Sequence, residues 1–162
     1  MSEPGMEGGG AAPAAPAGGS GELATYGQRI LAYIIDGAII MGIFIVGGIV
    51  VGILSAVSPK IGMIIGLIFY LVIMVGSLGY MIYFPAVDNG FTERGQTPGK
   101  KFMKIKIVKQ DGSDFSVVDA IIRLVGYACS GAIMYLGFIW IFIDDDNQGW
   151  HDKIAKTRVI QV

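Results

Sequence analysis

The sequence predicts an all-α membrane protein with two firm transmembrane helices, a third apolar segment and a small β-hairpin-like element on the cytoplasmic side. Hydrophobic residues make up 53% of the 162 residues, and charged residues only 15%. Soluble proteins carry about 25% charged residues, so this composition favours a lipid environment. The charges are also unevenly placed, because Lys60 is the only charged residue between Asp36 and Asp88.

The two predicted spans cover residues 29–54 and 61–84. Each contains an uncharged run that reaches the roughly 20 residues needed to cross a bilayer as a helix. The link between them is short, so they form an antiparallel hairpin. Near this link each span has two glycines at four-residue spacing, which puts each pair on one helix face where backbones approach closely. We expect the two pairs to contact each other: Gly48 and Gly52, and Gly62 and Gly66.

The chain divides into a tail, residues 1–24, and a membrane domain, residues 25–162. The tail consists mainly of Gly, Ala, Pro and a few acids, which bury too little apolar surface to offset the entropy of folding, so we expect it to be disordered. It carries no Lys or Arg, whereas a cleavable signal peptide begins with a basic region. The first span is therefore expected to remain as an anchor.

A polar loop, residues 85–118, follows the second span. Its GQTPGK sequence is typical of a turn, since Pro98 fixes its own φ and Gly99 tolerates a positive one. Residues 104–107 alternate Lys with Ile, which is the period of a half-exposed strand, and residues 110–113 predict a hairpin-like turn. The C-terminal residues 157–162 also predict a strand. A lone strand needs a partner, and the lysine-rich strand is the obvious one.

The third apolar segment, residues 116–143, has two interpretations. It is long enough for one span, but four small residues can break it into two short helices that enter and return: Gly126, Ser130, Gly131 and Gly137. With an inside N-terminus, three full spans leave eight Lys or Arg inside and four outside, whereas a re-entrant segment leaves only Lys60 outside. The positive-inside rule favours the re-entrant segment, with a full third span as the alternative.

Arg29 and Asp36 form the candidate polar site. Seven residues are nearly two helical turns, so both side chains share one face, about 10 Å apart along the axis. A carboxylate at that depth is costly unless it is paired, hydrated or protonated. Asp36 therefore either lines a polar cavity as a protonatable or cation-binding group, or pairs with Arg123, a lysine or a helix terminus and holds the bundle together.

The remaining residues give no sign of an enzyme. His151 is the only histidine and lies next to Asp152. It is either a supporting proton-relay residue or a satisfied interfacial histidine. The lone Cys129 cannot form an internal disulfide, and the sequence contains no metal-ligand spacing, cofactor motif or nucleophile–base pair. We therefore expect no metal and no cofactor, and the net charge of −1 suggests no nucleic-acid partner.

Three sequence blocks resemble the RDD family of bacterial integral membrane proteins, which is named for one arginine and two aspartates. YGQRILAYIIDGAII is similar to the first helix of the family, GQTPGKKFMKIKIVKQDG to its central stretch and WHDKIAKTRVI to its closing signature. The resemblance covers residues 25–162. It implies that Arg29, Asp36 and Asp152 are the family residues, with Asp88 and Asp144 as alternatives for the last of them.

The resemblance implies a membrane location but little mechanism, since sodium–proton exchange is proposed for some members and accessory roles for others. We expect a multi-pass protein of the cell membrane with a cytoplasmic N-terminus, which contacts the lipid bilayer and forms a homo-oligomer or binds a membrane-complex partner. One hypothesis is ion or small-solute transport through Asp36, with Arg29 tuning it. The alternative is a structural or accessory subunit that docks through its basic strand and C-terminus.

Overall fold

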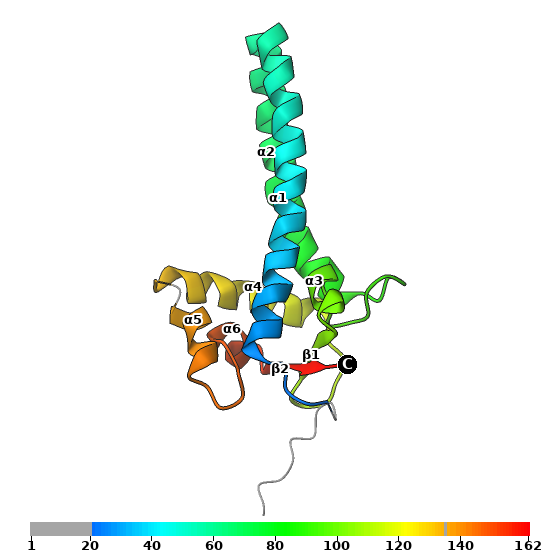
Figure 1. Cartoon of the computed structure of the whole chain (residues 1–162), viewed down its shortest axis with the longest axis vertical. Coiled ribbons are helices and arrows are strands. Elements are labelled where there is room, and N and C mark those ends of the chain that lie inside the picture. The colour runs from blue at the N-terminus through cyan, green and yellow to red at the C-terminus, as the bar shows by residue number, and fades with distance from the viewer. Residues whose placement is uncertain (1–20, 135) are drawn as a thin grey trace, which may run out of the picture.

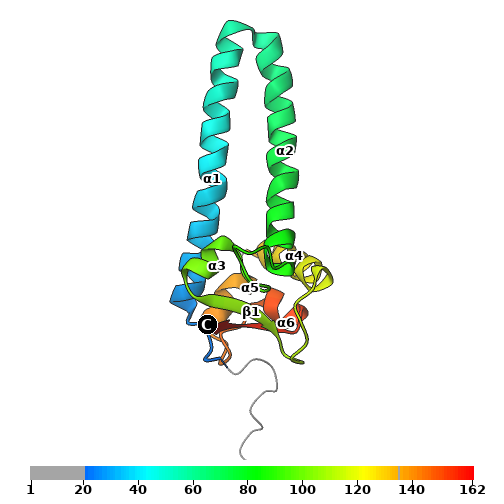
Figure 2. The ribbon, with the colours of Figure 1, turned by 90° about the vertical axis from the view of Figure 1, so that its right-hand side faces the viewer.

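The computed structural model describes residues 21–134 and 136–162, so most of the predicted tail, residues 1–20, lies outside the described residues. A long helical hairpin stands on a smaller headpiece (Figures 1 and 2). The hairpin consists of α1, Tyr26–Val57, and α2, Pro59–Ala86. The headpiece contains α3 (Pro98–Phe102), β1 (Ile105–Lys109), α4 (Val117–Ala132), α5 (Leu136–Ile139), the 3-10 helix η1 (Trp140–Phe142), α6 (Trp150–Ile154) and β2 (Thr157–Gln161).

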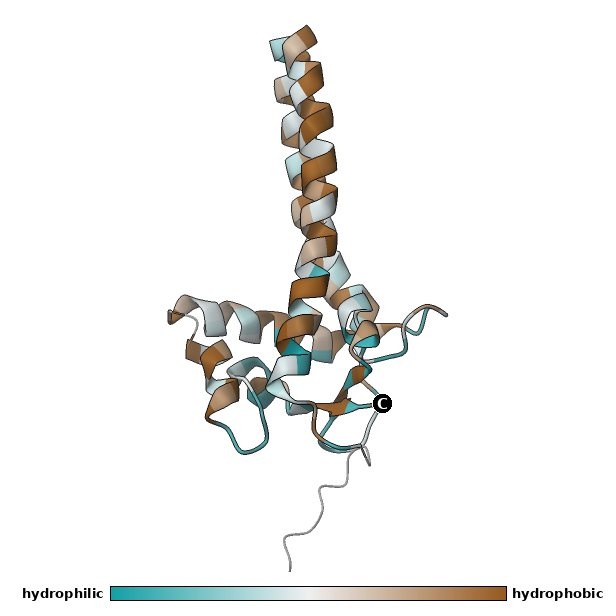
Figure 3. Ribbon diagram, in the orientation of Figure 1, coloured by the Kyte–Doolittle hydropathy of each residue, from teal (hydrophilic) through white to brown (hydrophobic). Residues whose placement is uncertain are grey.

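The hairpin helices are long and apolar enough to cross a membrane. The most apolar stretch of 18 residues in each helix has a mean hydropathy of 2.7 in α1 and 2.5 in α2. At most 6% of the residues in either stretch are buried inside the protein. Apolar residues continue along the hairpin above the headpiece (Figure 3). Both helices are longer than the predicted spans, and only Ser58 separates them. Pro59 begins α2, in the first helical turn, a position that proline suits because its fixed φ matches the helix.

The glycine pair of α2 lies where the two helices approach each other. A Cβ atom on Gly62 would come within 2.1 Å of the Ser55 hydroxyl oxygen, and one on Gly66 would lie 3.2 Å from Val51. A larger residue at position 62 would therefore push the helices apart at the tip of the hairpin. This part of the predicted glycine packing agrees with the structure.

The glycine pair of α1 does not face α2, so the predicted contact between the two pairs is wrong. Among the described residues, no atom would lie within 4 Å of a Cβ atom on Gly48 or Gly52. Gly47 contacts α2 instead, since a Cβ atom there would lie 2.1 Å from the Phe69 ring. The facing stripe of α1 thus runs through residue 47, and one residue further along a helix is a rotation of about 100°. Gly48 and Gly52 lie outside the hairpin contact.

The two strands pair as the alternating sequence predicts. β1 and β2 are antiparallel, with Ile107 opposite Val159, and both of these side chains are buried. The element is not a hairpin, however, because the turn at residues 110–113 leads from β1 toward α4 and not into β2. Leu23 forms a bridge to Ile160, and Ala24 donates a backbone hydrogen bond to Val159. Residues 21–24, predicted to belong to the tail, therefore extend the small sheet.

The third apolar segment is a bent pair of helices. The axis turns by 109° between α4 and the α5–η1 stretch, and α4 lies across the base of the hairpin (Figure 1). β1 precedes this segment, β2 follows it, and the two strands pair. The segment consequently starts and ends on the same side of the molecule, as in the re-entrant interpretation. The bend comes after Ala132, where α4 ends. Gly126 lies within α4, and its lack of a side chain lets α4 approach α6 closely.

Helix α4 directs its charged side chains inward and its apolar side chains outward, the opposite of a helix that packs on the core of a soluble protein. Its charged residues Asp119 and Arg123 are buried, whereas Val118, Ile121 and Val125 are exposed. A soluble helix directs its apolar stripe inward. The outward apolar stripe therefore indicates that lipid covers this part of the headpiece, and that the polar side of α4 faces the interior.

Candidate functional site

Arg29 lies in the first turn of α1. The Thr25 hydroxyl accepts a hydrogen bond from the backbone N–H of Gln28, and the Gln28 side chain accepts one from the N–H of Thr25, so a capping box fixes this turn. The Arg29 side chain is buried, and its guanidinium donates to the Asp152 carboxylate and to the Asn147 carbonyl oxygen. The first membrane helix is thereby tied to the last part of the chain.

Asp152, in α6, is fully buried and binds two arginines. Arg29 donates to one carboxylate oxygen and Arg123 of α4 donates to the other. The backbone N–H of Gly149 adds a third hydrogen bond of 3.1 Å. Burial alone would raise the pKa of Asp152, but Arg123 and Arg29 outweigh burial and hold that pKa well below its usual range. Asp152 is thus a charged link between α1, α4 and α6.

Arg123 extends this network from α4 to β2. Its guanidinium donates to the Thr157 hydroxyl as well as to Asp152, and to the Tyr127 hydroxyl at 3.3 Å. The side chain is 2% exposed. Five donors in a planar fork suit arginine to such a branched role. Arg123, a possible supporting residue and a candidate partner of Asp36 in the sequence, therefore pairs with Asp152 and not with Asp36.

Asp36 belongs to a second cluster, one that joins α1 to α2 and α3. The Tyr80 hydroxyl donates to Asp36 at 2.6 Å, the Thr97 hydroxyl donates at 2.5 Å, and the backbone N–H of Gly99 donates at 2.7 Å. The Asp36 side chain is 8% exposed. Of the partners that the sequence left open for Asp36, the structure provides a helix terminus, since Thr97 caps α3 and Gly99 lies in its first turn.

The GQTPGK stretch is the start of a helix, not the turn predicted from its composition. Thr97 accepts a hydrogen bond from the backbone N–H of Lys100, and Pro98 occupies the first helical position. A Cβ atom on Gly99 would lie 2.2 Å from the Ala32 carbonyl oxygen and 2.8 Å from the Asp36 carboxyl group. Only glycine lets α3 come this close to α1, and this approach explains its place in the motif.

His151 is completely buried beside the Asp152 network. Its Nε2 atom lies 3.3 Å from the Tyr33 hydroxyl and 3.4 Å from the Asp152 carboxylate, and its ring lies 4.4 Å from the Tyr127 ring. Burial lowers the pKa of His151 to about 3, because the charged form loses its hydration. The imidazole is therefore neutral near pH 7 and packs among aromatic rings.

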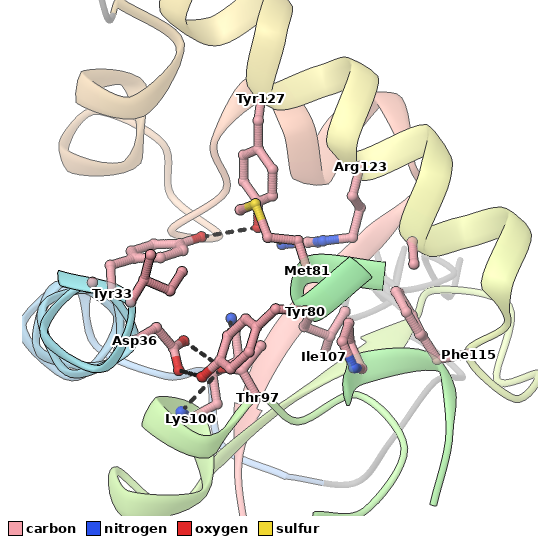
Figure 4. A pocket seen from close by; sticks show the side chains of 14 residues that line it. Tyr33, Asp36, Tyr80, Met81, Thr97, Lys100, Ile107, Phe115, Arg123 and Tyr127 are labelled. Atoms are coloured by element: carbon pink, nitrogen blue, oxygen red, sulfur yellow. Dashed lines mark hydrogen bonds between the residues drawn. The ribbon is translucent and has the colours of Figure 1, made fainter. Parts of the chain in front are cut away.

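A cavity of about 180 Å³ lies between the two clusters, where α1, α2, α3 and α4 meet. Tyr127 and Arg123 are on one side of it, and Thr97 and Lys100 are on the other (Figure 4). The Lys100 side chain is 4% exposed, and its ammonium lies 5.0 Å from the centre of the Tyr33 ring. The cavity thus joins two charge clusters that are distant along the chain.

The structure brings together most of the residues singled out from the sequence, although in two groups. Arg29, Arg123, His151 and Asp152 form one group, while Asp36 lies in the other. Among the competing aspartates, Asp152 is the one in contact with Arg29. Asp88 is exposed and binds the N–H of Gly90, and Asp144 pairs with Lys153.

Sequence reasoning missed the neutral partners of these charges. Tyr33, Tyr80 and Tyr127 lie on apolar helices, where a tyrosine attracts no attention because it suits a membrane boundary. The role of Thr97 does have a local signal, since a threonine directly before a proline is typical of a helix N-terminus. That pattern places a helix end, but it does not say which carboxylate the helix end meets.

The fold and this network define a class of helical membrane protein. Two apolar helices, long enough to cross a membrane, stand on a headpiece, and buried arginine–aspartate contacts hold that headpiece in place. The chain belongs to the RDD family, whose family model matches residues 23–156. It is similar to the "Uncharacterized protein YxaI" of Bacillus subtilis (strain 168), with 33% identity over 141 residues. That alignment covers 82% of this chain and 93% of the relative. No solved structure matches the chain significantly.

Proposed function

We propose that this chain is a structural or accessory subunit of a membrane complex, without enzymatic activity. The observation that carries this proposal is the use of the two buried aspartates. Asp36 joins α1 to α2 and α3, and Asp152 joins α6 to α1 and α4. Connected polar networks whose charges are paired rigidify a fold. Both carboxylates are thus engaged in holding the elements of one chain together.

The proposed neighbour in the bilayer is a second copy of the chain. Gly48 and Gly52 lie on α1, and no atom of the residues that the structure describes would lie within 4 Å of a Cβ atom on either, so another helix has room to approach there. Two small residues at four-residue spacing allow close backbone contact between membrane helices. A homo-oligomer through this face supports the accessory interpretation, because the pair is not used inside the hairpin.

Disulfide cross-linking tests this assembly. In a Cys129→Ser background, Gly52→Cys is expected to give an oxidised dimer in the membrane. Val50→Cys is the matched control, since it is half-exposed and lies about 200° around the helix from position 52. Equal cross-linking at both positions indicates random collision and counts against the proposed face. If Gly52→Cys instead forms a cross-linked product with a different protein, the partner at this face is that protein and not a second copy of the chain.

The basic strand is less available for docking than the sequence suggests. Lys106 lies 3.9 Å from Glu93, and Lys109 lies 3.4 Å from Asp119. These acids offset much of the charge that would attract a partner. The proposed assembly therefore uses the membrane helices, and reversing the charge of Lys106 is expected to leave the cross-linked dimer unchanged.

We further propose that the headpiece lies on the cytoplasmic side of the cell membrane. All twelve Lys and Arg residues except Lys60 lie in the headpiece or at the base of α1. Lys60 lies at the opposite end, in the first turn of α2. The positive-inside rule supports this orientation, which also places the N-terminus in the cytoplasm.

Ion or small-solute transport is the second candidate. It is favoured by one observation, namely that Asp36 lines the cavity of about 180 Å³ at the base of the hairpin. The test is sodium- or potassium-dependent proton flux in proteoliposomes, with Asp36→Asn as the variant and Asp111→Asn, at an exposed turn, as its control. Flux that only Asp36→Asn abolishes, in protein that still assembles, replaces the accessory role with transport. Absence of flux in the wild type rejects exchange of sodium or potassium for protons.

A further inference from the structure

The cavity between the two clusters carries an inference that is independent of the proposed accessory role. Its polar wall includes Tyr33, Lys100, Arg123 and Tyr127, and its other lining residues include apolar side chains of the hairpin such as Ile40 and Met81. It thus lies where the membrane helices meet the headpiece (Figure 4). At this level a transmembrane hairpin leaves the hydrocarbon core and reaches the lipid headgroups.

Lys100 is the least satisfied charge in this wall. Its ammonium has three donors, but the hydrogen bond it makes reaches the Thr97 hydroxyl at 3.5 Å, and it forms no salt bridge within the described residues. Burial lowers its pKa, because the charged form has lost its hydration. Asp36 also lines the cavity, but Tyr80, Thr97 and Gly99 already donate to its oxygens.

The charges around the cavity do not balance. Among the described residues of the two clusters, the buried cations are Arg29, Lys100 and Arg123, while the buried carboxylates are Asp36 and Asp152. His151 is neutral near pH 7, since its pKa is about 3. With Lys100 in its charged form, one positive charge is left in excess. Buried charges are ordinarily paired, so this excess next to a cavity calls for an anion.

We propose that this cavity binds one phosphate group, with Lys100 as its ionic partner and the Tyr33 and Tyr127 hydroxyls as further donors. A lysine ammonium binds phosphate as a point charge. The two hydroxyls are only 3.4 Å apart, so both can reach one oxygen-rich group. Each water occupies about 30 Å³ in the liquid, so a cavity of about 180 Å³ has room for such a group. The phosphate belongs either to an anionic lipid headgroup or to free inorganic phosphate.

The test uses the full chain, with each source of phosphate in its own arm. In the first arm, native mass spectrometry counts phosphatidylglycerol retained after purification from nanodiscs of phosphatidylcholine with phosphatidylglycerol. In the second arm, the thermal midpoint is followed in detergent as inorganic phosphate replaces chloride. Lys100→Met is expected to weaken binding about tenfold, the size of one lost hydrogen bond to a charged group. Lys101→Met is the control, since Lys101 is exposed and its ammonium contacts Phe91 instead.

Each outcome bears on the proposal. Binding in the first arm alone identifies a lipid headgroup, and binding in the second alone identifies free phosphate. Equal binding by wild type and Lys100→Met overturns the proposal. If Lys100→Met does not fold, Lys100→Arg is used in its place, because it keeps the charge. The wild type is then also tested by itself with phosphatidylglycerol and with inorganic phosphate. Wild-type protein that prefers neither phosphatidylglycerol over phosphatidylcholine nor phosphate over chloride also overturns it.

Discussion

Arg29 and Asp152 are 123 positions apart in the sequence and form a buried ion pair, with side chains 3% and 0% exposed. This pair closes the fold, because it connects the first turn of the first membrane helix to the last helix of the headpiece. Intact buried ion pairs add little net stability, since desolvation offsets their attraction. Loss of one partner is far more costly, because it leaves the other charge buried and unpaired.

Asp152→Asn is therefore expected to lower the free energy of unfolding by about 3–5 kcal/mol. The amide keeps the size of the side chain but leaves the guanidinium groups of Arg29 and Arg123 without a carboxylate. The measurement is thermal unfolding of the purified protein in nanodiscs. Asp114→Asn is the control, because Asp114 is exposed and lies 3.7 Å from Arg94, also exposed. Similar losses in both variants would mean that the Asp152 network does not hold the fold together.

Gly99→Ala is expected to separate α3 from α1. The added methyl group would lie 2.2 Å from the Ala32 carbonyl oxygen, which is backbone and cannot move aside. Such overpacking costs about 1–3 kcal/mol. Its readout is again the thermal midpoint, together with protease sensitivity of the loop before α3. Gly79→Ala in α2 is the matched control, since a Cβ atom there meets no atom of the described part of the chain within 4 Å and alanine suits a helix better. Equal stability of the two variants would contradict the close approach.

The sequence was informative wherever a pattern is local. The apolar runs of α1 and α2 predict membrane helices because their length matches a bilayer, and the alternation of lysine and isoleucine predicts β1. The pairing of β1 with β2 followed from a different argument, because an unpaired strand is unstable and each strand was the obvious partner of the other.

Contacts between distant segments were harder to predict. The seven-residue spacing puts Arg29 and Asp36 on one helix face, but it does not show that Asp152 meets the first and α3 meets the second. The glycine contact failed for a similar reason. Four-residue spacing defines a face of α1, whereas the rotation of that face depends on side chains such as Phe69 of α2.

His151 predicts an acid-sensitive fold. Its pKa is about 3 in the folded protein, against 6.5 for the ordinary side chain, so the unfolded chain binds a proton that the folded chain does not. The stability that depends on neutral His151 is therefore fully present above about pH 6.5 and is lost as the pH falls toward 3. The slope is on the order of 1.4 kcal/mol per pH unit. Protonation of Asp152 acts only at lower pH, because its pKa is held below the usual range.

His151→Gln is expected to flatten this slope between pH 6.5 and 4.5, since glutamine does not titrate. The measurement is the unfolding free energy across that range, and the slope counts even if the variant is less stable at every pH. A slope as steep as that of the wild type would mean that His151 is protonated in the folded protein. The Cys129→Ser variant serves as the control, because Cys129 is exposed and the substitution leaves His151 in place.

The pairing of β1 with β2 predicts that the turn after β1 and the C-terminus face the same compartment. Single cysteines at Lys60, Asp111 and Val162, in a Cys129→Ser background, report this with a membrane-impermeant maleimide. In intact cells Lys60→Cys is expected to react, whereas Asp111→Cys and Val162→Cys react only after permeabilisation. A full third span would place position 162 in the same class as position 60 instead. Opposite labelling of positions 111 and 162 would thus contradict the sheet, since strands on different sides of a bilayer cannot share backbone hydrogen bonds.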